Sequence, residues 1–143
     1  MVRLNAKSEG VHVEGLAELR KALKAIDAAA PKELAAAGKE VAGFVADDAR
    51  GLASGLGGVA AKVAPSIAPG GTQRGGSVNF GGSSYPMALG AEFGGQGRPT
   101  TQQFRPHLGT TGYFVYPAIR QDADRIETEF RNAIDHLMRK YDL

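Results

Sequence analysis

Apolar residues recur at helical spacing through the C-terminal part of the chain. Their separations are mostly three, four or seven positions, which places them on one side of a helix; they are Ile119, Ile126, Phe130, Ile134, Leu137, Met138 and Tyr141. Pro117 suits the first turn because its φ angle is already near the helical value. Charged residues fill the other faces, and no glycine or proline follows Pro117. The pattern predicts a long amphipathic helix that the rest of the chain must cover.

The N-terminal half predicts two more amphipathic helices. Apolar residues first step by three and four positions, at Leu16, Leu19, Leu23 and Ile26. A proline inside a helix costs about 3 kcal/mol, so Pro31 favours a break near Ala28–Ala30 and a second helix from Pro31; one kinked helix is the alternative. The second helix carries Leu34, Val41, Phe44, Val45 and Leu52 on one side. We interpret its Gly38 and Gly43 as places of close packing.

Short elements are expected elsewhere. Weak alternation allows a strand near either of two valine-containing pairs, Val2 with Leu4 and Val11 with Val13. The glycine-rich centre predicts strands around Ser66–Ala68 and Ser77–Phe80, joined by a mobile loop over Pro69–Gly76. One helical turn is expected over Val59–Val63, and Gly94–Gly112 reads as a second long loop. Tyr85–Phe93 is either a strand or a short helix, because periodicity does not separate them at this length.

Together these elements predict a single α+β domain over residues 1–143. N-terminal amphipathic helices and a long C-terminal helix would pack on a small antiparallel sheet with long Gly-rich loops. A chain of 143 residues is long enough to bury a core. Its 20 glycines cluster in the middle, which places the loops there.

Composition excludes several classes of protein. The chain has no cysteine, so disulfides, thiolate metal sites and thiol catalysis are excluded. No apolar run approaches the roughly 20 residues that span a bilayer, and the N-terminus lacks the apolar stretch of a signal peptide. We therefore expect no membrane association. The formal charge of +2 is too small to indicate nucleic-acid binding by itself.

No pattern in the sequence favours catalysis. The three histidines, His12, His107 and His136, are far apart and not spaced as metal ligands on one helix face. Asp47 and Asp48 form an acidic pair that a solvated helix face explains. The glycine runs lead into neither a phosphate-binding Gly-Lys-Ser/Thr phrase nor a strand–Gly-x-Gly-x-x-Gly–helix unit. We expect no catalytic residues, no cofactor and no metal site.

Charge is distributed unevenly. Between Lys62 and Gly112 the chain has four basic residues and one acid, Glu92, which gives that half +3 against −1 for the remainder. The basic residues are Lys62, Arg74, Arg98 and Arg105. One interpretation is that loop arginines only aid solubility. The other is that positively charged loops contact a polyanion or an acidic partner.

Two phrases of the sequence resemble a known family. The first is Tyr85-Pro-Met-Ala-Leu-Gly-Ala-Glu-Phe-Gly94, and the second is Tyr113-Phe-Val-Tyr-Pro-Ala-Ile119, which leads into the charged C-terminal helix. With the N-terminal Gly15-Leu-Ala-Glu-Leu19, this order of elements is similar to the neck proteins of long-tailed phages, the tail-component or tail-completion family. Tyr113 departs from the proline, and Tyr116 from the basic residue, that are common in the family at these positions.

The resemblance implies a non-enzymatic structural protein of the virion, placed at the head–tail junction and assembled in the host cytoplasm. Such proteins form rings, often sixfold, between the portal side and the tail tube. In this setting Arg74, Arg98 and Arg105 would contact a neighbouring ring or DNA in the channel. Five residues would be interface or packing anchors: Tyr85, Glu92, Phe93, Phe104 and Phe114.

Two other functions remain open at this point. A tail terminator, which caps the tail tube, would also be a small α+β ring subunit, and the sequence separates the two roles poorly. A small DNA-binding module would agree with the pI near 9.0. It is disfavoured because the helices have nearly balanced charges and none is a basic recognition helix.

Overall fold

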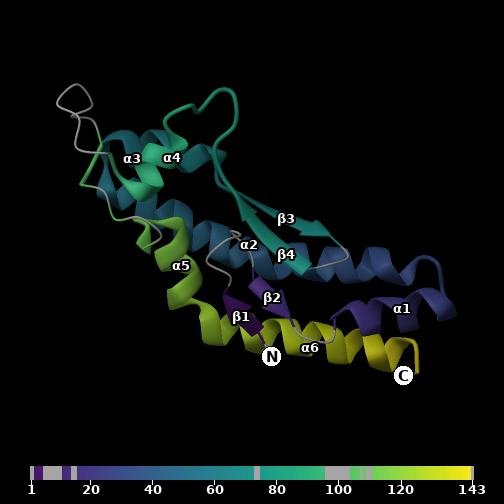
Figure 1. The fold of residues 1–143 in the computed structure, drawn as a ribbon. Helices are drawn as coiled ribbons and strands as arrows, with labels where there is room; N and C mark the ends of the chain where they lie inside the picture. Colours follow the sequence, from purple (N-terminus) through teal and green to yellow (C-terminus); the bar gives the residue numbers. More distant parts are fainter. Residues whose placement is uncertain are drawn as a thin grey trace.

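The computed structural model describes residues 2–4, 11–13, 16–72, 75–95, 104–106, 108 and 111–142 (Figure 1). These residues form an α+β fold, as predicted: helices predominate, and four strands make two small antiparallel hairpins. In chain order the elements are β1 Val2–Leu4, β2 Val11–Val13, α1 Leu16–Ile26, α2 Ala30–Leu56, α3 Gly58–Val63, the 3-10 turn η1 Ala64–Ser66, β3 Ala68–Thr72, β4 Gly75–Asn79, α4 Ala88–Phe93, α5 Val115–Gln121 and α6 Ala123–Lys140.

Helix α2 is the central element of the fold. It contacts α1, α3, α5 and α6 as well as the β3–β4 hairpin. Pro31 lies in its first turn, so the predicted break before Pro31 is confirmed. The helix continues through Gly51 and Gly55 to Leu56, where Ala49 and Ala53 are buried and Leu52 and Leu56 pack partly buried against the core.

The β3–β4 hairpin corrects the prediction of a mobile loop over Pro69–Gly76. Only residues 73 and 74 separate the strands, and Thr72 lies opposite Gly75 in the antiparallel register. Close packing is confirmed at Gly38 of α2, whereas the same prediction for Gly43 is wrong, because a Cβ atom there would meet nothing within 4 Å. A Cβ atom on Gly38 of α2 would lie 2.7 Å from the carbonyl carbon of Gly75, and one on Gly76 would overlap Gly38. The hairpin backbone therefore lies directly on the α2 backbone.

The C-terminal helix is present but divided. Its apolar stripe is buried, as predicted, at Ile119, Ile126, Phe130 and Leu137. The division falls at Asp122, where φ is −93° and ψ is 5°. Backbone hydrogen bonds nonetheless cross the division, from Asp122 N–H to the Ala118 carbonyl at 2.9 Å and from Ile126 N–H to the Asp122 carbonyl at 2.8 Å. The chain thus bends here without a loop.

The helices α2 and α6 lie side by side and antiparallel. The Lys140 ammonium at the end of α6 forms a 2.6 Å ion pair with Glu33 at the start of α2. In Figure 1, α1 and the β1–β2 hairpin lie on the near side of this helix pair, and α3 and α4 lie together at its far left end. The two short strands allowed by the N-terminal alternation are confirmed as β1 and β2.

Candidate interaction site at the junction of α4 and α5

The Glu92 carboxylate joins the end of α4 to the start of α5. Its side chain is fully buried. Oε2 accepts hydrogen bonds from the N–H groups of Phe114 at 3.1 Å and Val115 at 2.8 Å, and Oε1 accepts one from Tyr116 at 3.0 Å. The first N–H groups of a helix have no partner within the helix, so Glu92 supplies the acceptor that α5 lacks. We call Glu92, Phe93, Phe114, Val115 and Tyr116 the Glu92 junction.

Two opposing effects act on the protonation of this carboxyl. Burial raises the pKa of Glu92 above its ordinary value of 4.5, and the backbone N–H groups of α5 oppose the rise because they stabilise the charged form. Among the described residues, no basic side chain forms an ion pair with Glu92. The junction is thus a buried helix cap.

Aromatic rings close the junction on both sides. The rings of Phe93 and Tyr116 are 5.6 Å apart between centroids, and those of Phe80 and Phe114 meet edge to face at 6.1 Å. Phe114 is fully buried, which makes it a core residue as well as part of the junction. Gly112 has a positive φ of 72°, and a Cβ there would overlap the Glu92 carboxylate. The chain can therefore enter α5 this closely only with glycine at this position.

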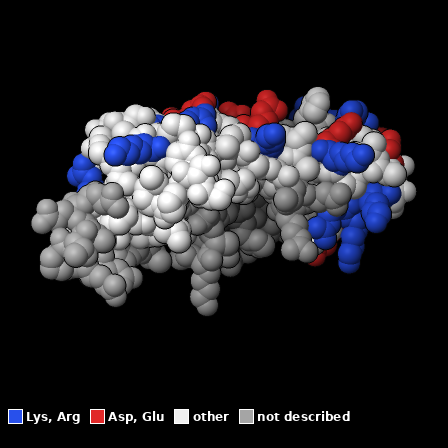
Figure 2. Space-filling view, turned by 90° about the horizontal axis from the view of Figure 1, so that it is seen from above, with Lys and Arg blue, Asp and Glu red and all other residues white. Residues whose placement is uncertain are grey.

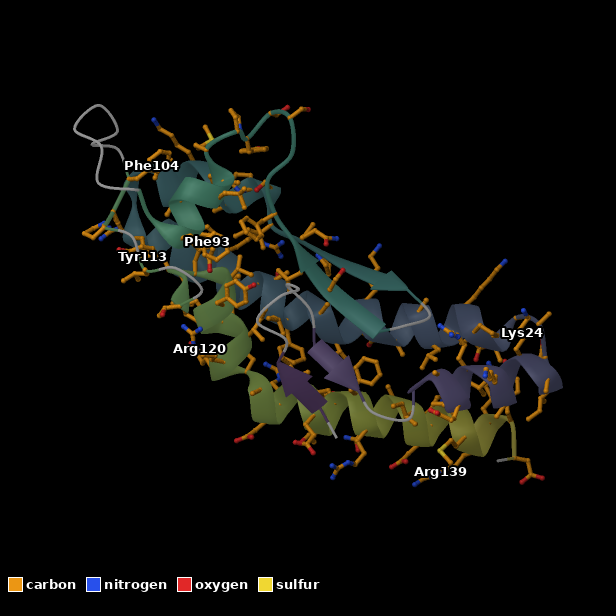
Figure 3. The ribbon with its side chains drawn as sticks, viewed as in Figure 1. Lys24, Phe93, Phe104, Tyr113, Arg120 and Arg139 are labelled. Atoms are coloured by element: carbon orange, nitrogen blue, oxygen red, sulfur yellow. The ribbon has the colours of Figure 1, made fainter. Side chains whose placement is uncertain are left out.

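The segments on either side of residues 96–103 are tied to the same junction. Gly95 N–H donates to the Arg105 carbonyl at 2.8 Å, and Leu108 N–H donates to the Phe93 carbonyl at 2.9 Å. The Tyr113 hydroxyl donates to the Pro106 carbonyl at 2.6 Å. Phe104 packs its ring on the backbone of Gly90, where a Cβ would lie 2.6 Å from a ring carbon. Figure 3 shows Phe93, Phe104 and Tyr113 grouped at this end of the molecule.

Of the three arginines predicted to contact a partner, the structure describes Arg105. Its guanidinium donates a 2.7 Å hydrogen bond to the Leu56 carbonyl at the end of α2 and lies 6.0 Å from the centre of the Tyr113 ring. The residue is exposed, so its charge is presented to solvent from a fixed position. Arg74 and Arg98 lie outside the described residues.

The predicted anchor residues divide into two kinds. Glu92 and Phe114 are fully buried, whereas Tyr85, Phe93 and Phe104 are half-buried around α4. Tyr85 precedes α4 in a turn and packs against the core. The region Tyr85–Phe93, left open between strand and helix, forms the helix α4 over its second half.

The sequence interpretation missed a second buried carboxyl, Asp122, at the bend between α5 and α6. Asp122 is 7% exposed, and its Oδ2 has no hydrogen-bond partner in the described part of the chain. Burial, and then the adjacent carboxyl of Asp48, raise its pKa from 3.8 to about 6, while Arg125 opposes the rise. The prediction that Asp47 and Asp48 are both solvated is therefore half right, because Asp47 is exposed and paired with Arg50 and Asp48 faces Asp122.

Among the described residues, no group of three or more histidine or acidic side chains is placed to hold a metal ion. His136 is exposed on α6, while His107 and the side chain of His12 lie outside the described residues. No helix in the described part of the chain combines the length and apolar character needed to cross a membrane.

Comparison of the chain with protein-family models, with curated proteins and with solved structures finds no match. Any proposal of function consequently rests on the residues and their geometry.

Proposed function

We propose that this protein is a structural component of the phage head–tail junction, a neck or tail-completion subunit that connects the portal side of the capsid to the tail tube. The observation that carries the proposal is the Glu92 junction. The two phrases that resemble the phage family are about twenty residues apart in the sequence, yet Glu92 of the first caps the helix that the second begins. Residues that resemble a family pattern are more informative when they form one structural unit.

The anchoring of the surrounding segments suits a connector. Virion subunits of this kind need a rigid frame that presents loops to neighbouring rings. Here Gly95, Arg105, Pro106 and Leu108 are tied to the junction by backbone and tyrosine hydrogen bonds. Arg105 presents a positive charge beside them. We propose that Arg105, together with Arg74 and Arg98, contacts an acidic neighbouring ring or DNA in the channel, and that the role requires no catalysis or cofactor.

The proposal is tested by electron microscopy of lysates from the phage that carries this gene, after deletion of the gene. Filled heads beside complete, unattached tails are expected, and a plasmid-borne copy should restore attachment. Tails of uncontrolled length would instead assign the protein as a tail terminator. Normal infectious particles would overturn the proposal.

A matched variant connects this test to the junction. Glu92→Ala on the plasmid should fail to restore attachment, whereas Glu127→Gln, a change on the exposed side of α6, should restore it. Protein levels measured in the same lysates show whether the Glu92 variant accumulates. If Glu92→Ala accumulates normally and restores attachment fully, the junction is not needed for the proposed role.

A further inference from the structure

A groove lies between α2 and α6. Its volume is about 650 Å³. Small and apolar side chains form its floor, among them Ala36, Ala37, Phe44, Ala133 and Leu137. Because alanines project little from a helix, a second helix can approach this floor to the 8–10 Å separation that is usual between packed helices.

The rim of the groove is acidic. The lining contains three carboxylates, Glu33, Glu40 and Glu129, and one guanidinium, Arg125, so its net charge is −2 with His136 neutral. Lys140 pairs with Glu33 at one end, and Arg125 stacks 4.0 Å above the Phe44 ring. Glu40 and Glu129 are exposed, and in the described part of the chain neither has an ion-pair partner.

The outer face of α1 has the complementary character. Lys21 and Lys24 are exposed on it, with Ala17 one turn before and Ala28 just beyond the helix. Ala17, Lys21 and Lys24 are separated by three or four residues and share one side of α1. Arg20 lies beside them, and Glu18 is the one acidic residue of α1, which gives the helix a net charge of +2.

The two surfaces lie on opposite sides of the molecule. On α2, Glu33, Ala36 and Glu40 lie across the helix from Ala35 and Ala42, which contact the β3–β4 hairpin. Helix α1 lies on the near side of the α2–α6 pair in Figure 1. Figure 2 shows acidic side chains, interleaved with basic ones, along the edge turned away from that viewpoint and a basic group at one end of the opposite edge.

We propose that the outer face of α1 in one copy of this chain docks in the α2–α6 groove of the next copy. Surfaces on opposite sides of one molecule cannot satisfy each other within it, and a head-to-tail contact of two different surfaces closes into a ring when its rotation closes. Lys21 and Lys24 would face Glu40 and Glu129, with alanines of both copies packed between them. The inference deepens the proposed function, on which it rests for the expectation that copies associate, by assigning the contact.

Charge reversal tests the contact. Sedimentation velocity compares the wild type with a basic-face variant, Lys21→Glu/Lys24→Glu, and a groove variant, Glu40→Lys/Glu129→Lys. Each variant alone should weaken self-association at least about tenfold at low salt, because like charges then face each other. Asp124→Lys and Lys62→Glu, which change exposed charges away from both surfaces, are the matched controls and should associate as the wild type does.

The decisive result is restoration by a mixture. The two reversed variants, mixed in equal amounts, should associate again, because every contact between unlike copies pairs opposite charges. A single chain with all four reversals should also associate. Added salt should weaken the wild-type complex, since exposed pairs are screened at about 10 Å in 0.1 M salt.

Three outcomes would overturn the contact: a wild type that stays monomeric at every concentration, variants that associate unchanged, or a mixture that stays apart. Each leaves the deletion experiment untouched. A phage that loses tail attachment without the gene, while the reversed variants still associate, would support the junction role and reject this interface. If the phage is normal without the gene, while charge reversal and mixing change self-association as expected, the interface is supported and the junction role is rejected.

Discussion

The N–H group of Val115 donates a 2.8 Å hydrogen bond to the buried carboxylate of Glu92, 23 residues earlier in the chain. This bond, with those from Phe114 and Tyr116, sets where α5 begins relative to α4. The aromatic rings of Phe93 and Tyr116 pack beside this bond, so the end of α4 and the start of α5 are held together at this point.

Removal of this carboxylate should destabilise the fold. Glu92→Ala leaves three helix N–H groups without their acceptor and opens a cavity, so we expect the free energy of unfolding to fall by about 2–4 kcal/mol. Chemical denaturation followed by circular dichroism measures the change. Glu127→Gln, which alters a half-exposed carboxylate of α6 that pairs with Arg131 at the surface, should change stability by less than about 0.5 kcal/mol. A Glu92→Ala variant as stable as the wild type would show that water replaces the cap.

The pair of Asp48 and Asp122 should make stability depend on pH. Folding raises the pKa of Asp122 from 3.8 to about 6, so the folded chain binds this proton more tightly than the unfolded chain. The resulting stabilisation is fully present below about pH 4 and is lost as the pH rises through 6. We expect the free energy of unfolding to decrease by about 1–2 kcal/mol over that interval from this group.

Asp122→Asn isolates the contribution of this group. Asparagine stays neutral, so the variant should lose this part of the pH dependence and be more stable than the wild type at pH 7.5. Urea unfolding at a series of pH values measures both effects. Asp124→Asn, an exposed neighbour in the first turn of α6, is the control and should leave the profile unchanged. Parallel profiles for the wild type and Asp122→Asn would contradict the assignment.

Substitution by alanine should have opposite effects on the stability of the fold at two glycines of α2. A methyl group at Gly38 would lie 2.7 Å from the Gly75 backbone, whereas one at Gly43 meets nothing within 4 Å. Gly38→Ala should therefore destabilise the fold by about 2 kcal/mol despite its better helix propensity, and Gly43→Ala should stabilise it by about 0.5–1 kcal/mol. Thermal or chemical unfolding of both variants tests this. Equal effects would mean that the hairpin does not lie on α2 as described.

Arg105 should matter for attachment more than for folding. Arg105→Glu reverses an exposed charge and removes one hydrogen bond to the Leu56 carbonyl, so stability should fall by no more than about 1 kcal/mol. On the plasmid in the deletion phage, we expect the variant to reduce infectious particles at least about tenfold, with unattached tails. Lys62→Glu, a reversal on α3, is the control. Full infectivity with Arg105→Glu would remove Arg105 from the proposed contact surface.

The elements whose evidence is local could be read from the sequence. The helix break before Pro31 follows from the backbone N–H group that proline lacks. The apolar side of the C-terminal helix, from Ile119 to Leu137, follows from the spacing of its residues alone. Both agree with the structure within a residue or two. The position of the bend at Asp122 was not predicted, because nothing nearby in the sequence interrupts helical propensity.

Other features depend on distant partners and were decided by tertiary structure. The glycines of Pro69–Gly76 predicted a mobile loop, yet they permit a hairpin to lie against Gly38 of α2, which only the folded neighbour reveals. The sequence could identify Glu92 as unusual through the phrase around it. It could not show that its partners are the N–H groups of α5, because a hydrogen bond across 22 to 24 residues leaves no periodic signal in the chain.

The sequence by itself thus determined the helices, their apolar sides and the α+β class, since these follow from local propensity and from periodic burial. Tertiary structure alone decided which carboxyls lose water, where strand backbone meets helix backbone, and how the basic face of α1 and the acidic groove of α2 and α6 come to lie on opposite sides. Those properties depend on which side chains are removed from water and on which residues far apart in the chain come close together in space. The spacing of residues along the sequence does not encode either.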